Sequence, residues 1–231
     1  MRSLLIFSIT LLFISSIFAS QLIQPENEIR KYIENSVPYV GTEIPRMDGM
    51  DGTGIKIAII DTGVDFNHPD LFGWGPDGKV IGGYNFIKEN ELPMDINGHG
   101  TKVAGIIAAD GNTLGVAHKA KILAYKVSED GEGVSSELIR KAIEKAIEDK
   151  ADIINISLGV NKTNSKIDSA VNHAWDNGIF VVTAAGNDGP ELKTIGSPGR
   201  NFESITVGAT YNNMTSSLIA TLEIDEKQYT V

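Results

Sequence analysis

Three absences limit what this 231-residue chain can do. It contains no cysteine, which excludes disulfides, thiolate metal sites and a cysteine nucleophile. It has no surplus of basic residues: the formal net charge is −10, which argues against binding to nucleic acid or docking on anionic lipid. It has no internal repeats or low-complexity tracts, and with 42% hydrophobic and 22% charged residues it has the composition of a globular protein.

The N-terminal residues are typical of a secretory signal peptide. Arg2 precedes a nearly unbroken apolar run from Leu4 to Phe18, and Ala19 and Ser20 are small residues suited to cleavage. The run is shorter than the roughly 20 residues that a membrane-spanning helix needs, so cleavage is favoured over a membrane anchor. The sequence therefore predicts a secreted, extracellular protein with no membrane attachment after cleavage.

The rest of the chain alternates between expected strands and expected helices. This alternation predicts an α/β fold, with a doubly wound, mainly parallel sheet flanked by helices and incomplete at its C-terminal end. Strands are expected at Ile55–Asp61, Val80–Phe86, Lys121–Val127, Asp152–Ser157, Ile179–Ala184 and Ser204–Gly208, and helices at Gly98–Ala109, from Ser135 or Ser136 to Lys150, and at Ser165–Asn177.

Four segments follow from these patterns. Residues 1–19 are the signal peptide, and residues 20–50 form a polar N-terminal arm with a short helix-like piece. Residues 51–211 form the α/β domain. Residues 212–231 look like two strands around a turn with no helix after them, and could be the start of an inserted β-rich domain.

Three polar residues stand where acyl-transfer chemistry would need them. Asp61 ends the first buried strand, His99 lies between glycines at the start of a helix, and Asn187 follows a later strand. In parallel sheets, sites gather at the carboxyl ends of strands. An acid can hold and stabilise a histidine base, and an amide can donate to a developing oxyanion. We therefore expect these residues to meet at one rim.

Each residue alone has a plainer explanation. Asp61 could be a turn residue, His99 a solvent-exposed loop histidine, and Asn187 part of a turn after a strand. The Asp-Thr-Gly at Asp61 also occurs in aspartic proteases, which need a second such carboxylate that this chain lacks. The segment Ser157, Leu158 and Gly159 could offer backbone groups to an extended peptide, or could simply end a strand.

Together, six motifs in order resemble the subtilisin-like serine proteases (subtilases) between about Gly54 and Gly208. They are IAIIDTGVDFNHPDL, NGHGTKVAGIIAA, GVAHKAKILAYKV, ADIINISLG, VVTAAGNDGP and SITVGAT. The resemblance implies that Asp61 is the triad acid, His99 the general base and Asn187 the oxyanion donor. It also implies that Ser157, Leu158 and Gly159 bind a polypeptide substrate.

The chain departs from the family in four respects. No Gly-Thr-Ser occurs, although the family carries its nucleophilic serine in a Gly-Thr-Ser-Met-Ala-like turn, and Lys102 stands where the family usually repeats a histidine. The segment before the domain is short for the family's pro-region. Asp70 matches a family calcium ligand, but the loop Asp110–Leu114 is too short for the usual partner loop, so neither a metal nor another cofactor is predicted.

These observations predict a secreted subtilisin-like serine endopeptidase that uses an Asp-His-Ser triad. We expect the chain to be a fragment that lacks the serine and is inactive alone, with a downstream segment carrying the nucleophile. One alternative is a non-catalytic peptide-binding module that has lost the serine, although such a module has no chemical need for Asp61 and His99. A nucleotide-binding domain is disfavoured, because Gly52-Thr53-Gly54 precedes a strand instead of following one.

Overall fold

A computed structural model describes Val37, residues 40–131, 133–189 and 191–209, and the backbone of 221–224 and 227–230. The expected signal peptide, the helix-like piece of the arm and residues 210–220 lie outside these described residues. Within the described ranges, no helix combines the length and apolar character needed to cross a membrane.

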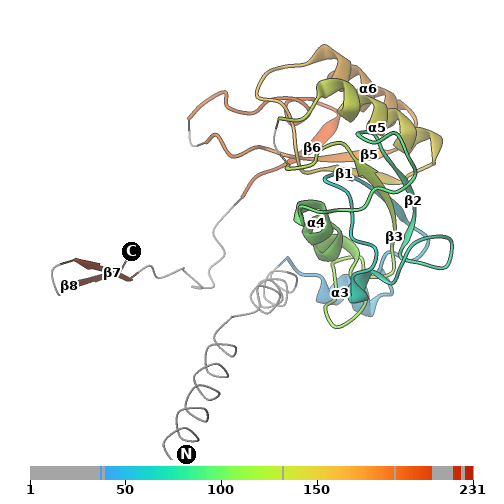
Figure 1. The fold of residues 1–231 in the computed structure, drawn as a ribbon, viewed down its shortest axis with the longest axis horizontal. Coiled ribbons are helices and arrows are strands. Elements are labelled where there is room, and N and C mark those ends of the chain that lie inside the picture. Colours follow the sequence, from blue (N-terminus) through green and yellow to red (C-terminus); the bar gives the residue numbers. More distant parts are fainter. Residues whose placement is uncertain are drawn as a thin grey trace, which may run out of the picture.

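A six-stranded sheet forms the centre of the fold, and every neighbouring pair of its strands is parallel. The strand order is β2–β3–β1–β4–β5–β6, and Figure 1 shows the helices packed around this sheet. The strands are β1 (Lys56–Asp61), β2 (Val80–Asn85), β3 (Lys121–Lys126), β4 (Ile153–Ile156), β5 (Phe180–Ala184) and β6 (Ser204–Val207). The helices are α3 (Glu43–Met47), the 3-10 turn η1 (Pro69–Leu71), α4 (His99–Ala108), α5 (Ser136–Glu148) and α6 (Ser165–Asp176).

Alternate side chains of β1 pack into two separate hydrophobic cores, one on each face of the sheet. Ala58 and Ile60 pack into a cluster with α5 and α6, whereas Ile57 and Ile59 pack into a cluster with α4. All four are 5% exposed or less. A parallel strand that is buried on both faces needs a continuous apolar sequence, and that is why the run before Asp61 has no polar residue on either face.

Local signals in the sequence place the helix ends. Asn164 caps α6, because its side chain accepts hydrogen bonds from the backbone N–H groups of Lys166 and Ile167. Gly178, with φ of 77°, follows the last turn of α6. The predicted doubly wound α/β fold is confirmed, and the six strands of the sheet and helices α4, α5 and α6 begin and end within two residues of their expected bounds. The short helix α3 and the turn η1 were not predicted.

The tail contains the two expected strands, in a separate antiparallel pair. They are β7 (Thr221–Ile224) and β8 (Lys227–Thr230).

In the six-stranded sheet, β1, β4 and β5 are consecutive neighbours. Their carboxyl ends therefore lie side by side, and the segments that follow them share one rim.

Candidate active site

Asp61 and His99 meet at this rim, as the sequence predicts. Asp61 is the last residue of β1 and His99 the first residue of α4. The Nδ1 atom of His99 lies 2.7 Å from the Oδ1 atom of Asp61. An ionised carboxylate can only accept a hydrogen bond, so this contact requires the proton on Nδ1 and leaves Nε2 as the acceptor nitrogen.

Burial controls the acid of this pair. Asp61 is 0% exposed, and its Oδ1 atom also accepts the backbone N–H of Thr62 at 2.7 Å. Burial raises the pKa of Asp61, and the hydrogen bonds from His99 and Thr62 oppose that shift. Its Oδ2 atom is buried and has no hydrogen-bond partner among the described residues. The carboxylate is therefore held in one place and faces the imidazole with one oxygen.

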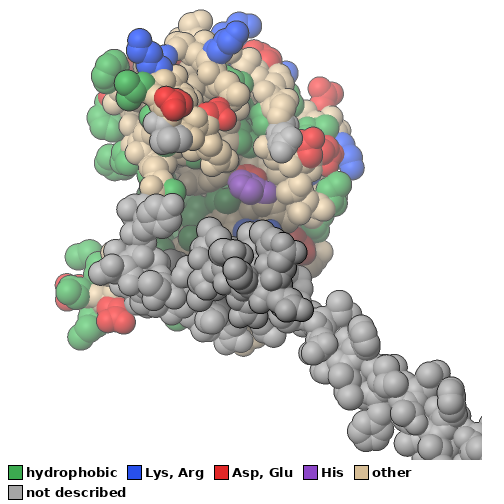
Figure 2. Space-filling model, turned by 90° about the vertical axis from the view of Figure 1, so that its left-hand side faces the viewer, with side chains coloured by type: hydrophobic (Ala, Val, Ile, Leu, Met, Phe, Trp, Pro, Cys, Tyr) green, Lys and Arg blue, Asp and Glu red, His purple; other side chains and the backbone are tan. Residues whose placement is uncertain are grey.

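The base, in contrast, is open to solvent. The side chain of His99 is 48% exposed, and Figure 2 shows a hollowed face of the molecule in which a histidine side chain is exposed. Gly98 has φ of 97°, a backbone conformation that favours glycine. A Cβ at Gly100 would lie 2.1 Å from the carbonyl oxygen of Gly63 and 3.1 Å from Oδ1 of Asp61. Position 100 therefore needs glycine so that the helix start can approach the acid.

A second buried carboxylate, Asp95, lies next to the pair and was not among the residues predicted from the sequence. It is 7% exposed and accepts hydrogen bonds from Thr62, Asn97, Gly98 and Thr101. Burial alone would raise the pKa of Asp95, but the hydrogen bonds from Thr101, Gly98 and Asn97 outweigh it and hold the pKa below the ordinary value. The Asp-x-Asn-Gly sequence before His99, a turn pattern, was the available signal.

Asn187 and the 157–159 segment have fewer hydrogen bonds to the rest of the rim than Asp61 and His99 have. Asn187 lies three residues beyond β5, is exposed, and its side chain makes no hydrogen bond with the described residues. Ser157, Leu158 and Gly159 follow β4, and an antiparallel bridge between Val160 and Ser197 closes the end of that segment. Asn187 follows β5 and the 157–159 segment follows β4, which lies between β1 and β5. Among the described residues, neither makes a hydrogen bond to His99.

Asp70, which matches a family calcium ligand in sequence, accepts a backbone hydrogen bond in this structure. The Oδ1 atom of Asp70 accepts the backbone N–H of Asn112 at 2.7 Å, and a Cβ at Gly111 would lie 2.2 Å from the same oxygen. The short loop thus brings a backbone N–H, and not a further oxygen ligand, against this carboxylate oxygen. No group of three or more acidic or histidine side chains with metal-site geometry occurs in the described part of the chain.

The remaining histidines contact other parts of the fold. His173 is exposed, and its Nδ1 atom lies 2.9 Å from Oε2 of Glu144. His68 and His118 are half-buried. His68 is held because its Nδ1 atom accepts the backbone N–H of Asp70 at the start of η1.

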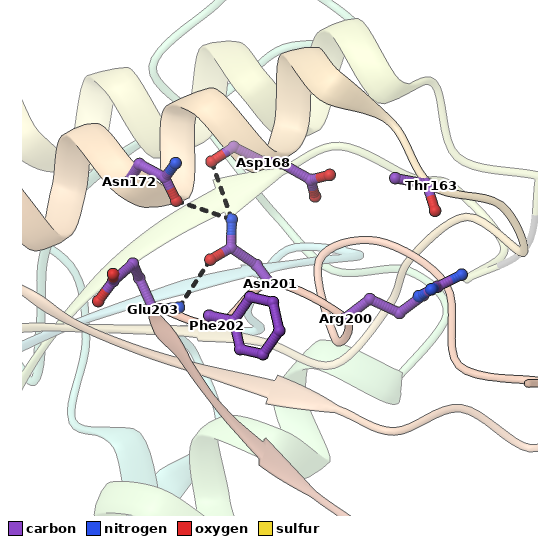
Figure 3. Close-up of a pocket in the computed structure, with 7 residues that line it drawn as sticks. All are labelled: Thr163, Asp168, Asn172, Arg200, Asn201, Phe202 and Glu203. Atoms are coloured by element: carbon purple, nitrogen blue, oxygen red, sulfur yellow. Dashed lines mark hydrogen bonds between the residues drawn. The ribbon is translucent and has the colours of Figure 1, made fainter.

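A pocket of about 400 Å³ lies elsewhere, between α6 and the loop before β6. Figure 3 shows Asn201 at its centre, donating to the carbonyl oxygen of Asp168 and to the side chain of Asn172. The backbone N–H of Glu203 donates in turn to Asn201. These hydrogen bonds fasten the loop to the helix, and the pocket contains neither Asp61 nor His99.

The protein is therefore an α/β protein with a paired acid and base at one rim of its parallel sheet. The acid is the buried Asp61 at the end of β1, and the base is the half-exposed His99 at the start of α4. The chain belongs to the subtilase family, because the model of that family matches residues 52–223.

Several curated relatives agree with this assignment. The minor extracellular protease Vpr of Bacillus subtilis is 39% identical over 199 residues, the thermophilic serine proteinase of Bacillus sp. strain AK1 is 44% identical over 162 residues, and thermitase of Thermoactinomyces vulgaris is 40% identical over 178 residues. The matches cover 80%, 68% and 75% of this chain, but 24%, 38% and 61% of the respective relatives. The chain therefore spans less than two-thirds of the length of these relatives.

Proposed function

We propose that this protein is the acid–base part of a secreted serine endopeptidase, which hydrolyses peptide bonds with Asp61 as the acid and His99 as the base. The observation that carries the proposal is the 2.7 Å contact between the buried Asp61 and the half-exposed His99. The names of the similar proteins, among them an extracellular protease and a serine proteinase, support it.

In the proposed reaction, His99 takes the proton of a serine hydroxyl through Nε2 while the serine oxygen attacks the carbonyl carbon of the scissile bond. Asp61 holds the imidazole in the required tautomer and stabilises the imidazolium that forms. The proton then passes from His99 to the leaving amine, and water hydrolyses the acyl-enzyme by the same acid–base route.

Two further roles belong to this proposal. Asn187 donates its side-chain amide to the oxyanion, a role known from subtilisin, where losing the donor costs about 2.7–4 kcal/mol of transition-state stabilisation. Its exposed position leaves that amide open to a substrate. Ser157, Leu158 and Gly159, in the segment that follows β4, bind the polypeptide substrate as an added strand along that segment.

The serine itself is proposed to come from a segment outside this sequence, since the chain contains no Gly-Thr-Ser. A fluorophosphonate probe, which reacts with activated serines, is expected to leave the purified 231-residue chain unlabelled. Labelling at any serine of this chain would overturn the proposed source of the nucleophile.

The decisive experiment adds that segment. The genomic reading frame after the codon of Val231 is expected to encode a Gly-Thr-Ser-Met-Ala-like motif, and the protein extended through it is expected to hydrolyse peptides. His99→Ala should lower kcat/KM by about 10⁶-fold, the size of the loss known from subtilisin. His173→Ala, which removes another exposed histidine, is the matched control and should leave kcat/KM unchanged.

Two outcomes would contradict the proposal. If the His99→Ala variant still hydrolyses peptides, His99 is not the general base. An extended protein that binds peptides without cleaving them would favour the non-catalytic peptide-binding module instead.

Secretion is tested separately. The exported protein is expected to begin near Ser20 or Gln21, because the apolar run ends there with small residues. N-terminal sequencing that finds an intact Met1 on the exported protein would contradict signal cleavage.

A further inference from the structure

Asp95 has more hydrogen bonds than a loop carboxylate needs. Its Oδ1 atom accepts from the hydroxyl of Thr62 at 3.0 Å and from the backbone N–H groups of Asn97 and Gly98, both at 2.9 Å. Its Oδ2 atom accepts from the backbone N–H of Thr101 at 2.9 Å and from the Thr101 hydroxyl at 2.5 Å. One buried carboxylate thus binds residues on both sides of His99.

The start of α4 depends on these contacts because it lacks an ordinary cap. The first N–H groups of a helix have no partner within the helix, and a side chain at the N-cap usually accepts one of them. Here the N-cap is Gly98, whose φ of 97° disfavours any residue with a side chain. The carboxylate of Asp95 takes over this role from three residues earlier in the chain, and binds the N–H of Thr101.

Thr62 connects this carboxylate to the acid. Its hydroxyl donates to Asp95 and accepts the backbone N–H of Gly100 at 2.9 Å, while its own backbone N–H donates to Asp61. The carbonyl oxygen of Thr62 accepts from the buried ammonium group of Lys126 at 2.7 Å. The residue after the acid and the residues around the base are therefore tied to the same carboxylate.

We infer that Asp95 is a positioning residue, which sets the distance and orientation of His99 against Asp61 by holding Thr62 and the first turn of α4 together. Asp95 does not touch the reacting groups. It fixes the backbone on both sides of the imidazole, so the Nδ1 proton of His99 points at Asp61 and Nε2 stays free. This inference rests on the proposed roles of Asp61 and His99, and adds a residue that those roles do not include.

The test is nitrogen-15 NMR of the full 231-residue chain with labelled histidine. In the unchanged chain, neutral His99 is expected as the Nδ1–H tautomer, with a low-field proton resonance from the hydrogen bond to Asp61. Asp95→Asn should remove that resonance and mix the two tautomers, because an amide cannot accept five hydrogen bonds. Helix content and the signals of residues in the two cores should stay as they are.

Two further comparisons separate positioning from folding. Thr62→Val removes the connecting hydroxyl and should also lose the resonance, whereas Thr62→Ser keeps the hydroxyl and should retain it. Asp149→Asn removes a carboxylate that instead accepts from Tyr125 and Lys145, and is expected to leave His99 unchanged. If Asp95→Asn fails to fold, the two Thr62 variants decide the question.

The outcomes distinguish the inference from the proposed function. A low-field resonance and a single tautomer that persist in both Asp95→Asn and Thr62→Val would overturn the positioning role alone. An unchanged chain whose His99 is the Nε2–H tautomer would overturn the Asp61–His99 pairing, and the positioning role with it.

Discussion

Two regions in or next to the central sheet differ in how their side chains are contacted. The acid–base corner comprises residues 61–62, at the end of β1, and residues 95–101, in the loop before α4 and its first turn. The β5–β6 edge comprises residues 180–184 and 202–207. In the corner, Asp61 and Asp95 are buried and bound by several donors. At the edge, Phe180, Ile205 and Val207 are each more than half exposed, although they are apolar. The corner is closed by hydrogen bonds between segments distant in sequence, whereas the edge presents apolar side chains to solvent.

The two regions contribute different residues to the proposed site. The corner fixes the acid and the base through hydrogen bonds among its own residues, and Lys126 of the adjoining β3 donates to the carbonyl oxygen of Thr62. The edge gives only Asn187, three residues after β5, whose side chain has no partner among the described residues. The acid–base pair can therefore be preorganised before any oxyanion donor or nucleophile is in place.

The largest expected effect compares the core with the edge. Ile156, in β4, is 0% exposed, and Ile156→Ala should lower the free energy of unfolding by about 2–5 kcal/mol through lost burial and a cavity. Ile205, in β6, is 52% exposed, and Ile205→Ala should cost less than about 1 kcal/mol. Urea unfolding followed by circular dichroism measures both. Equal losses would mean that the edge is covered in solution.

Within α4, two glycines give the next comparison. Gly100→Ala places a Cβ 2.1 Å from the carbonyl oxygen of Gly63, and should lower the free energy of unfolding by about 1–3 kcal/mol. Gly105→Ala places its Cβ where no atom other than the neighbouring backbone of α4 lies within 4 Å, and should raise the free energy of unfolding by about 0.5–1 kcal/mol. Opposite signs in the same urea experiment are the expected result, and a tolerated Gly100→Ala would mean a looser corner.

A smaller effect distinguishes the two buried carboxylates of the corner by pH. Because the pKa of Asp95 is lowered, its ionised form stabilises the fold above the ordinary aspartate pKa, and this stabilisation is lost as pH falls through the lowered value. Asp95→Asn should therefore cost about 1.5–3 kcal/mol at pH 7, the range for hydrogen bonds to a charged group, and progressively less below about pH 4.

Asp61 should behave in the opposite way. Because burial raises its pKa, the folded state binds the proton more tightly, and the ionised form opposes folding as pH rises through that raised value. Asp61→Asn should therefore be at least as stable as the unchanged chain at pH 7, and its relative stability should fall as pH is lowered. Thermal unfolding between pH 3 and pH 7 measures the stability of each variant relative to the unchanged chain. If this relative stability changes with pH in the same direction for Asp95→Asn and Asp61→Asn, the opposite pKa shifts assigned to the two carboxylates are wrong.

The fold could be predicted from the sequence because its signals are local. The apolar run before Asp61 predicts a doubly buried strand, and the pattern ending at Gly178 predicts α6, whose position the structure confirms. The pairing of Asp61 with His99 was predicted from the resemblance to the subtilases, together with the rule that sites gather at the carboxyl rim of a parallel sheet.

The role of Asp95 could not be predicted in the same way. Its donors come from Thr62, more than thirty positions earlier, and from the first turn of α4, and only tertiary structure brings these segments together. The closed environment of Asp70 was equally hidden, since it depends on a backbone N–H from the distant Asn112. The sequence identifies the residues with chemistry, but the contacts that orient them depend on the packing of separate segments.

The most direct test of the central claim is the kcat/KM of the serine-containing protein with and without Asp61→Asn. If Asp61 holds His99 in the tautomer that accepts the serine proton, the substitution should lower kcat/KM by about 10⁴-fold while the fold is unchanged. A variant that keeps more than a tenth of the original kcat/KM would contradict the claim that this buried carboxylate sets the base.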